Sequence, residues 1–314
     1  MQDMMENIEY VMLSKEQIQS KVQELAGILN EKYAGKNPVF IGVLKGVFMF
    51  FADMVREITV PCEIDFMCIS SYHGTESTGQ SVVKKDVSVD LKGRHVVILE
   101  DIYDTGNSLD FTYRYLQGKE PASLTICTLL DKPERRKPGI TLVPDYVGFT
   151  IPNEFVVGYG LDFNEHYRNL PFVGVLKGVV IFFADMVRNV DIPCEIDFMS
   201  ISSYSGTTST GRTEIRKDVS VDIKGRHVII LEDIFDTGTS LTFTVNHLLN
   251  KQPASLKVCT FLDKPDRRRP GITLKPDYVG YTIPNEFVVG YGLDFNEHYR
   301  NLPYIGILKP EMYE

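Results

Sequence analysis

Two acid-rich loops, 132 residues apart, hold the side chains most able to do chemistry in this chain. The first lies in VVILEDIYDTGNSL (96–109) and the second in VIILEDIFDTGTSL (228–241). In each, an apolar run typical of a buried strand ends in two acids, a third acid follows, and small polar residues open a helix-like segment. Backbone N–H groups at such a helix start converge on one spot, and the helix dipole adds to their attraction for anions. The pattern therefore predicts a phosphate site with three carboxylates beside it.

The acids Glu100, Asp101 and Asp104 allow two interpretations of the first loop. In one, they only cap a helix that follows a strand. In the other, they surround a ligand, because two like charges about 4 Å apart repel by roughly 4 kcal/mol at an effective dielectric of 20. Sugar hydroxyls or a divalent cation would relieve that repulsion, and hard oxygen ligands favour Mg²⁺. We expect a ligand site at both loops, with Mg²⁺ as its cofactor.

The loops recur because most of the chain is a tandem repeat. Shifted by 132 positions, residues 39–168 pair with residues 171–300 without a gap, and 96 of the 130 positions are identical. A unit of this length can bury its own core, since domains cluster near 100–150 residues. We predict two globular domains, residues 1–170 and 171–314, of which the second lacks an N-terminal helix of its own.

Hydrophobic periodicity predicts the elements that position the loops. Ser14 and Gln17 form a capping-box signature, and apolar residues follow at three- and four-residue steps up to Tyr33, which indicates one amphipathic helix. Strand-like and helical runs then alternate at 38–44, 46–58, 95–99, 105–118, 123–130 and 145–151. This order favours an α/β fold with a parallel sheet covered by helices. Ligands bind beyond the carboxyl ends of such strands, where both loops fall.

The junction between the copies is ambiguous. RNLPFVGVLKG (168–178) matches KNPVFIGVLKG (36–46), the first core strand, and equally matches RNLPYIGILKP (300–310) near the end of the chain. One segment cannot serve as the last strand of one copy and the first strand of the next. Either the chain's own tail or a neighbouring chain could complete the first copy, since near-identical tandem copies invite exchange. The sequence leaves the ownership of residues 171–178 open.

Composition excludes several classes of protein. The net charge of −9 weighs against a nucleic-acid surface, which needs a basic face. No apolar run approaches the roughly 20 residues of a membrane span, and the start lacks the order of a signal peptide. The five cysteines include no CxxC pair and are expected to be reduced core thiols. We expect a cytoplasmic protein that binds neither nucleic acid nor membranes.

The E-D-x-x-D-T-G loop resembles the phosphoribosyl pyrophosphate motif of type I phosphoribosyltransferases. Other segments resemble the hypoxanthine-guanine branch of that family: LKG at 44–46, SSYHGTESTGQ at 70–80, LLDKP at 129–133 and EFVVGYGLDFNEHYR at 154–168. The resemblance covers essentially the whole chain. It implies the type I phosphoribosyltransferase fold, present twice, with a central parallel sheet, flanking helices and a small hood over the base. It also implies purine salvage, in which a 5-phosphoribosyl group passes to N9 of hypoxanthine or guanine.

The resemblance assigns roles on the sugar-phosphate side. The general acid/base at purine N7 would be Asp104 in the first copy and Asp236 in the second, a role worth about 10²–10⁴ in rate. The metal shell would comprise Glu100, Asp101, Asp162, Glu232, Asp233 and Asp294. The remaining ligands of phosphoribosyl pyrophosphate would be Lys45, Gly46, Ser71, Tyr72, Thr105, Gly106, Asn107, Ser108 and Arg168, matched by Lys177, Gly178, Ser203, Tyr204, Thr237, Gly238, Thr239, Ser240 and Arg300. The family also implies a cis peptide between Leu44 and Lys45. The stretch after Ser71 would be a mobile lid, although a floppy surface loop fits the same composition.

On the base side, Lys132 carries most of the specificity. A lysine offers only donors, so it suits the O6 acceptor of a 6-oxopurine and is a poor match for the amino group of adenine. Taken alone, KPERRKPG indicates a solvated basic turn. With the family as guide, the purine-binding residues would be Lys132, Phe155, Val156, Lys264, Phe287 and Val288.

Three alternatives to this function stay open. The enzyme could act on another base, such as xanthine or adenine. The fold could serve a non-catalytic regulator or scaffold, or one copy could be active and the other inactive. In this family the hood is built from segments at both ends of a domain, so a copy that lacks either segment could be inactive although its loops are intact. We also expect self-association, as a pseudo-dimer within the chain or as a homo-oligomer.

Overall fold

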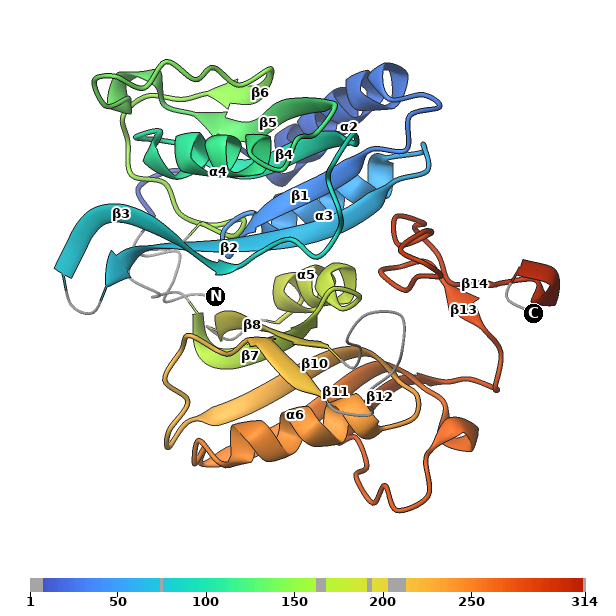
Figure 1. Ribbon diagram of the computed structural model, residues 1–314. Coiled ribbons are helices and arrows are strands. Elements are labelled where there is room, and N and C mark those ends of the chain that lie inside the picture. The colour runs from blue at the N-terminus through green and yellow to red at the C-terminus, as the bar shows by residue number, and fades with distance from the viewer. Residues whose placement is uncertain (1–7, 74–75, 162–167, 191–193, 203–212, 313–314) are drawn as a thin grey trace. The chain divides into compact units, whose positions relative to one another are not determined.

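The computed structural model describes residues 8–73, 76–161, 168–190, 194–202 and 213–312, with the backbone alone at 71–73, 76–80 and 168–170. The chain divides into two compact units. The first-repeat unit comprises residues 9–163 and 296–301, and the second-repeat unit comprises residues 1–8, 164–295 and 302–314. Each unit contains one six-stranded, mostly parallel sheet with helices packed on it, which confirms the predicted fold class (Figure 1).

The first-repeat sheet has the strand order β3-β2-β1-β4-β5-β6. Its elements are α2 (Lys15–Lys32), β1 (Val39–Leu44), α3 (Phe48–Glu57), β2 (Glu63–His73), β3 (Glu76–Lys85), β4 (His95–Tyr103), α4 (Asn107–Gln117), β5 (Ser123–Asp131), the 3₁₀ turn η1 (Pro133–Arg135) and β6 (Tyr146–Thr150). Strands β1, β2, β4, β5 and β6 are parallel, and β3 is antiparallel to β2. The predicted alternation of strands and helices is confirmed, and β3 occupies the stretch that composition predicted to be a lid or loop.

Helix α2 forms where the capping signature and the apolar periodicity place it. The Ser14 N–H donates to Gln17 Oε1 at 2.8 Å, and the Gln17 N–H donates to Ser14 Oγ at 3.3 Å. The helix buries one face and contacts α3 and β6. Within the described ranges, no helix is both long and apolar enough to cross a bilayer.

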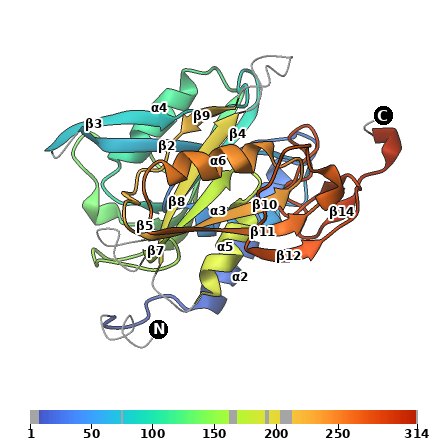
Figure 2. The ribbon, with the colours of Figure 1, turned by 90° about the horizontal axis from the view of Figure 1, so that it is seen from below.

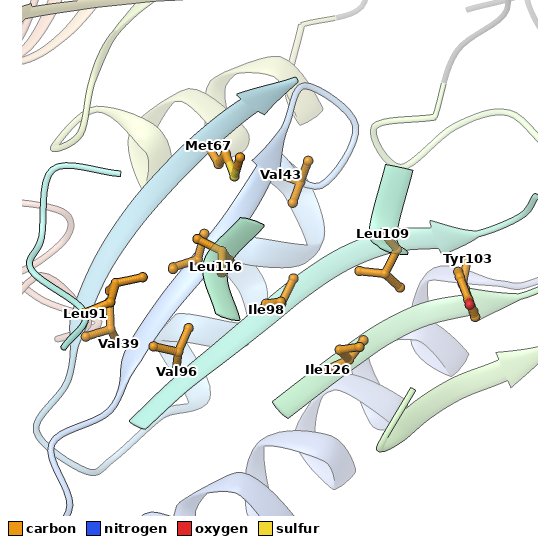
Figure 3. Close-up of a cluster of buried hydrophobic side chains, with 11 residues drawn as sticks. Val39, Val43, Met67, Leu91, Val96, Ile98, Tyr103, Leu109, Leu116 and Ile126 are labelled. Atoms are coloured by element: carbon orange, nitrogen blue, oxygen red, sulfur yellow. The ribbon is translucent and has the colours of Figure 1, made fainter. Parts of the chain in front are cut away.

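Alternate residues of the central strands pack against α4. Ile98 on β4 and Ile126 on β5 lie in one cluster with Leu109 and Leu116 of the helix (Figure 3), and Ile41 on β1 belongs to the same buried cluster. Each such side chain contributes about 1.5–3 kcal/mol on burial. This two-residue alternation fixes which face each strand presents, and so fixes where the strands end.

The second-repeat sheet has the order β12-β11-β10-β7-β8-β9. Its elements are β7 (Arg168–Leu176), α5 (Val180–Arg188), β8 (Cys194–Ser202), β9 (Glu214–Lys217), β10 (His227–Phe235), α6 (Thr239–Leu249), β11 (Ser255–Asp263), η2 (Pro265–Arg267) and β12 (Tyr278–Thr282). Figure 2 shows α6 lying across the strands of this sheet. After β12, the short strands β13 (Val288–Val289) and β14 (Gly306–Ile307) pair antiparallel, and the turn η3 (Pro310–Met312) follows.

The junction segment lies in the second sheet. Strand β7, which spans the predicted boundary at residues 170 and 171, pairs in parallel with β8 and β10. In the sheet it takes the central position that β1 holds in the first repeat. The chain's tail contributes residues 296–301 to the first-repeat unit, where Asn301 Nδ2 donates to the Ile58 carbonyl at 2.8 Å.

The packing of α3 on β1 makes Gly42 a sensitive position. A β-carbon there would lie 2.7 Å from Phe51 Cδ2, so we expect Gly42→Ala to lower the free energy of unfolding by about 1–3 kcal/mol. Gly27 is a matched control, because it lies on the exposed side of α2 with nothing within 4 Å of a β-carbon. Gly27→Ala should raise stability by about 0.5–1 kcal/mol. Urea unfolding of the two variants checks this, and equal effects would contradict the packing described.

Candidate active site

Each acid-rich loop joins the carboxyl end of a central strand to a helix start. In the first repeat β4 ends at Tyr103 and α4 begins at Asn107, with Gly106 as the N-cap at φ 91°. In the second repeat Gly238 caps α6 at φ 84°. Neither helix start is capped by a side-chain hydrogen bond. The predicted phosphate sites lie at these helix starts. They are lined by Thr105, Asn107 and Ser108 in the first repeat and by Thr237, Thr239 and Ser240 in the second.

Glycine is required at these N-caps for two reasons. The left-handed backbone at Gly106 disfavours any residue with a β-carbon. A β-carbon there would also lie 2.7 Å from Ile140 Cγ2. At Gly238 the corresponding distance to Ile272 Cγ2 is 2.8 Å.

Glu100 and Glu232 are buried acids, and each has one carboxyl oxygen without a hydrogen-bond partner among the described residues. They are 7% and 8% exposed, and the oxygen in question is Oε2 in each. Burial raises the pKa of each carboxyl well above its ordinary value, and the charge on the adjacent Asp101 or Asp233 raises it further. A buried acceptor left unsatisfied costs about 1–3 kcal/mol. The donor set thus fits a hydroxyl-bearing ligand with a hard cation.

Three segments meet beside Asp101. A β-carbon at Gly46 would overlap the Asp101 carboxylate, and one at Gly160 would overlap the Gly46 carbonyl oxygen. Gly178, Asp233 and Gly292 repeat this arrangement in the second repeat. The Leu44–Lys45 and Leu176–Lys177 peptide bonds are both cis. The structure therefore brings the predicted Lys-Gly segments against the acids of the loop.

Asp104 and Asp236 lie on the loops and are partly exposed. Arg135 Nε pairs with Asp104 Oδ1 at 2.9 Å, and Arg267 Nε pairs with Asp236 Oδ1 at 3.2 Å. A carboxylate that reaches solvent from this loop can exchange a proton with a bound base.

Arg136 and Arg268 anchor the loops, and sequence reasoning missed them by assigning KPERRKPG to a solvated turn. The Arg268 guanidinium lies 3.2 Å from the centroid of the Phe235 ring, donates to the Phe235 carbonyl at 2.5 Å, and also bonds the Asp236 carbonyl and the Asp263 carboxylate. Arg136 repeats these contacts on Tyr103, Asp104 and Asp131. The double arginine in each DKP-x-R-R segment is the only signal that could have suggested this role.

The second repeat contains a cavity of about 430 Å³ at this site. Its lining includes Asp236, Lys264, Arg267, Phe287, Val288 and Asp294. Burial lowers the pKa of Lys264, while the negative charge on Asp236 acts in the opposite direction. Strand β13 fixes Val288, which pairs with Ile307 of β14, and the Phe287 ring packs edge-on against Phe295 at 5.6 Å. The predicted purine residues of this repeat thus line one cavity with the predicted acid/base.

The corresponding residues of the first repeat are arranged differently. Lys132 is buried, and its Nζ donates to the Glu154 carbonyl at 2.5 Å. Phe155 is 72% exposed, and Val156 belongs to no strand.

Other predicted residues lie apart from these clusters or beyond the described ranges. Ser71 and Tyr72 lie on β2, where the backbone alone is described. Arg168 begins β7, opposite Cys194 of the second sheet. Arg300 is buried in the first-repeat unit, 3.3 Å from Glu297 Oε2, so it does not share a unit with Asp236. Asp162, Ser203 and Tyr204 lie outside the described residues.

In each repeat a mostly parallel sheet carries an acid-rich loop, a glycine-capped helix start and a Lys-Gly segment against the acids, an arrangement suited to binding an anion. Comparison with known families agrees, because the phosphoribosyl transferase domain model matches residues 12–164 and again residues 163–296. The chain belongs to the phosphoribosyltransferase family and carries its domain twice.

Several of its relatives match one copy of this domain over nearly their whole length. The hypoxanthine-guanine phosphoribosyltransferase of Streptococcus pneumoniae is 51% identical over 176 residues, which are 55% of this chain and 97% of the relative. The enzyme of the same name from Lactococcus lactis is 50% identical over 171 residues, 54% of this chain and 92% of the relative. A crystal structure of the hypoxanthine phosphoribosyltransferase of Staphylococcus aureus is 44% identical, with a TM-score of 0.49, and covers 53% of this chain and 92% of its own.

The buried Glu232 makes stability depend on pH. Because its folded pKa is raised above the unfolded value, its stabilising contribution is complete below the unfolded pKa and is lost as pH rises through the folded pKa. We expect Glu232→Gln to match the parent at about pH 4 and to be more stable by about 1–3 kcal/mol at about pH 9, in the absence of ligand. Urea unfolding across this range checks it, with the exposed Glu214→Gln as control. A constant difference between parent and Glu232→Gln would contradict the assignment.

The guanidinium of Arg268 should act through the loop that it holds. Lysine cannot supply the planar fork, so we expect the double variant Arg136→Lys/Arg268→Lys to lower kcat by about 10-fold or more, at the scale of a misplaced catalytic group. Arg269 is exposed, and the first repeat has Lys137 in its place, so Arg269→Lys is the matched control. If these arginines act by placing the loop acids, the loss in the double variant should fall on kcat more than on KM. Parallel losses in both variants would contradict this role.

Proposed function

We propose that this chain transfers the 5-phosphoribosyl group of phosphoribosyl pyrophosphate to N9 of hypoxanthine or guanine, giving IMP or GMP and pyrophosphate. The cavity of the second repeat carries the proposal, because one space is lined by an acid, a buried lysine, an aromatic ring and a backbone edge. The names of the relatives, hypoxanthine-guanine phosphoribosyltransferases, support the same substrates.

The loop of the second repeat would hold the sugar phosphate. The N–H groups from Thr237 to Ser240 would bind the 5′-phosphate at the start of α6. Glu232 and Asp233 would bind the ribose hydroxyls and, with Asp294, hold Mg²⁺. When bound, this ion would screen the charge of pyrophosphate. The unsatisfied Oε2 of Glu232 supports this assignment.

The purine would lie between Phe287 and the loop. Lys264 can donate to O6 of a 6-oxopurine, and a lysine has no acceptor for the amino group of adenine. The Val288 backbone, fixed by β14, presents its edge to the base. These features favour hypoxanthine and guanine over adenine.

The transfer forms the N9–C1 bond and breaks the bond between C1 and pyrophosphate, whose oxygen keeps the electron pair. Positive charge grows on the ribose in the transition state, and the carboxylates of Glu232 and Asp233 stabilise it. Asp236 would accept the proton that purine N7 loses as N9 forms its bond to C1. Lys177 and Gly178 would contact the pyrophosphate.

Three further statements belong to this proposal. The functional domains are residues 1–170 and 171–314, and the enzyme works in the cytoplasm, where its five cysteines, all free in the structure, stay reduced. It also self-associates. Strand β12 exposes Tyr278, Val279 and Tyr281, whereas α2 contacts the corresponding strand β6 of the first repeat.

The lysine that reads O6 provides the test. A charge-assisted hydrogen bond is worth about 1.5–3 kcal/mol, so the double variant Lys132→Ala/Lys264→Ala should lose roughly 10- to 100-fold in kcat/KM for hypoxanthine. Lys275→Val removes an exposed lysine from the same unit, at a position where the first repeat has Val143, and should behave like the parent. Initial rates with hypoxanthine, guanine, xanthine and adenine check both. An unchanged kcat/KM in the double variant, or no turnover of any base by the parent, would contradict the proposal.

A further inference from the structure

The base side of the second repeat depends on the tail that follows it. The Tyr291 N–H donates to the Leu302 carbonyl and the Leu308 N–H to the Phe287 carbonyl, both at 2.8 Å. Between these bonds β13 pairs with β14, and a β-carbon at Gly290 would overlap the Tyr304 carbonyl oxygen. Residues 302–308 thus hold Phe287 and Val288 at the cavity.

The first repeat has no such support, because the matching segment is used elsewhere. The counterparts of residues 302–308 are residues 170–176, and these lie in β7, paired with β8 and β10. Within the described part of the first repeat, no strand corresponds to β13. A β-carbon at Gly158, the counterpart of Gly290, would meet nothing within 4 Å.

The side chains show the same difference. Phe155 is 72% exposed, whereas its counterpart Phe287 is partly buried against Phe295. The Lys132 ammonium is bonded to the Glu154 carbonyl, whereas Lys264 makes no such bond in the described second repeat and lines the cavity. One of the three N–H donors of Lys132 is therefore engaged by the backbone in the first repeat.

The sugar-phosphate side shows no such difference. Gly106 caps α4 in the left-handed conformation, as Gly238 caps α6. Glu100 Oε2 is as buried and unpartnered as Glu232 Oε2, and Gly46 approaches Asp101 as Gly178 approaches Asp233. In the described residues the two repeats share the glycine-capped helix start, the buried glutamate and the approach of the Lys-Gly segment, and the contrasts at Lys132, Phe155 and Gly158 lie where the base would bind.

We propose that the chain has one purine site, in the second repeat, and that the first repeat is a sugar-phosphate site that takes no base. The proposal rests on the function above and deepens it. The junction strand builds the second sheet, so, in the residues that the structure describes, the first repeat lacks a counterpart of β14 to support its base side. Transfer then occurs once per chain, while Mg²⁺–phosphoribosyl pyrophosphate occupies both loops.

Binding stoichiometry of the unmodified chain is the first test. Calorimetric titration should give one IMP per chain and two phosphoribosyl pyrophosphates per chain in Mg²⁺-containing buffer. Two IMP per chain would overturn the proposal and leave the proposed function standing. One phosphoribosyl pyrophosphate per chain would overturn the sugar-phosphate half. Absence of IMP binding would overturn this inference and the proposed function together.

Local fluorescence then assigns the site. The chain has no tryptophan, so Phe287→Trp and Phe155→Trp each place a single reporter at matched positions. Stacking of the base should quench the emission of Phe287→Trp on addition of IMP and leave that of Phe155→Trp unchanged. Quenching in Phe155→Trp would overturn the assignment, and calorimetry on both variants controls for lost binding.

Discussion

A β-strand can pair in only one place at a time. Residues 170–176 have two possible places, the second-repeat sheet and a position in the first repeat like the one that residues 302–308 hold in the second. In the sheet, Phe172, Val173, Val175 and Leu176 are all buried. In the tail, Tyr304 is the counterpart of Phe172 and is 59% exposed, and Ile307 is the counterpart of Val175 and is 64% exposed. At about 1.5–3 kcal/mol for each buried side chain, the sheet is favoured by roughly 3–6 kcal/mol. Withdrawing β7 would also leave the facing edges of β8 and β10 unpaired, which costs further.

This preference explains why near-identical sequences form unequal sites. The loops after β4 and β10 are local structures, set by a strand, a glycine and a helix start, so both copies form them. The hood is not local, because it needs a segment that lies after residue 168 in one copy and after residue 300 in the other. Only the second copy has such a segment to spare.

The acids at the loops show a cost that function imposes on stability. Glu100 and Glu232 sit among apolar strands, each with an oxygen that no described residue satisfies. A glutamine or an apolar side chain would suit the empty protein better. A ligand that donates a hydrogen bond to this oxygen would remove the penalty, so its binding would stabilise the fold.

The sequence was sufficient to predict most of the elements and the loops, because both follow from short-range patterns, but β2 was not among the predicted runs. The capping residues Ser14 and Gln17 and the two-residue alternation through Ile98 act within a few positions. Arg136 and Arg268 could not be predicted, since the contacts of a long side chain depend on where the preceding strand ends. Strand β3 was missed because a stretch rich in Gly, Ser and Thr fits a loop as well as an edge strand. The sequence could not decide which repeat owns the junction, since residues 168–178 match both residues 36–46 and residues 300–310. The burial of Phe172 and Val173 in the second sheet decides between the two positions.

Hydrogen exchange along the backbone tests the central claim, that the junction segment is a core strand, without any ligand. The amides of residues 173–176 should exchange as slowly as those of residues 41–44, and those of residues 156–157 faster than those of residues 288–289. The account would be contradicted if residues 173–176 exchanged as fast as residues 304–308, or if residues 156–157 were as protected as residues 288–289.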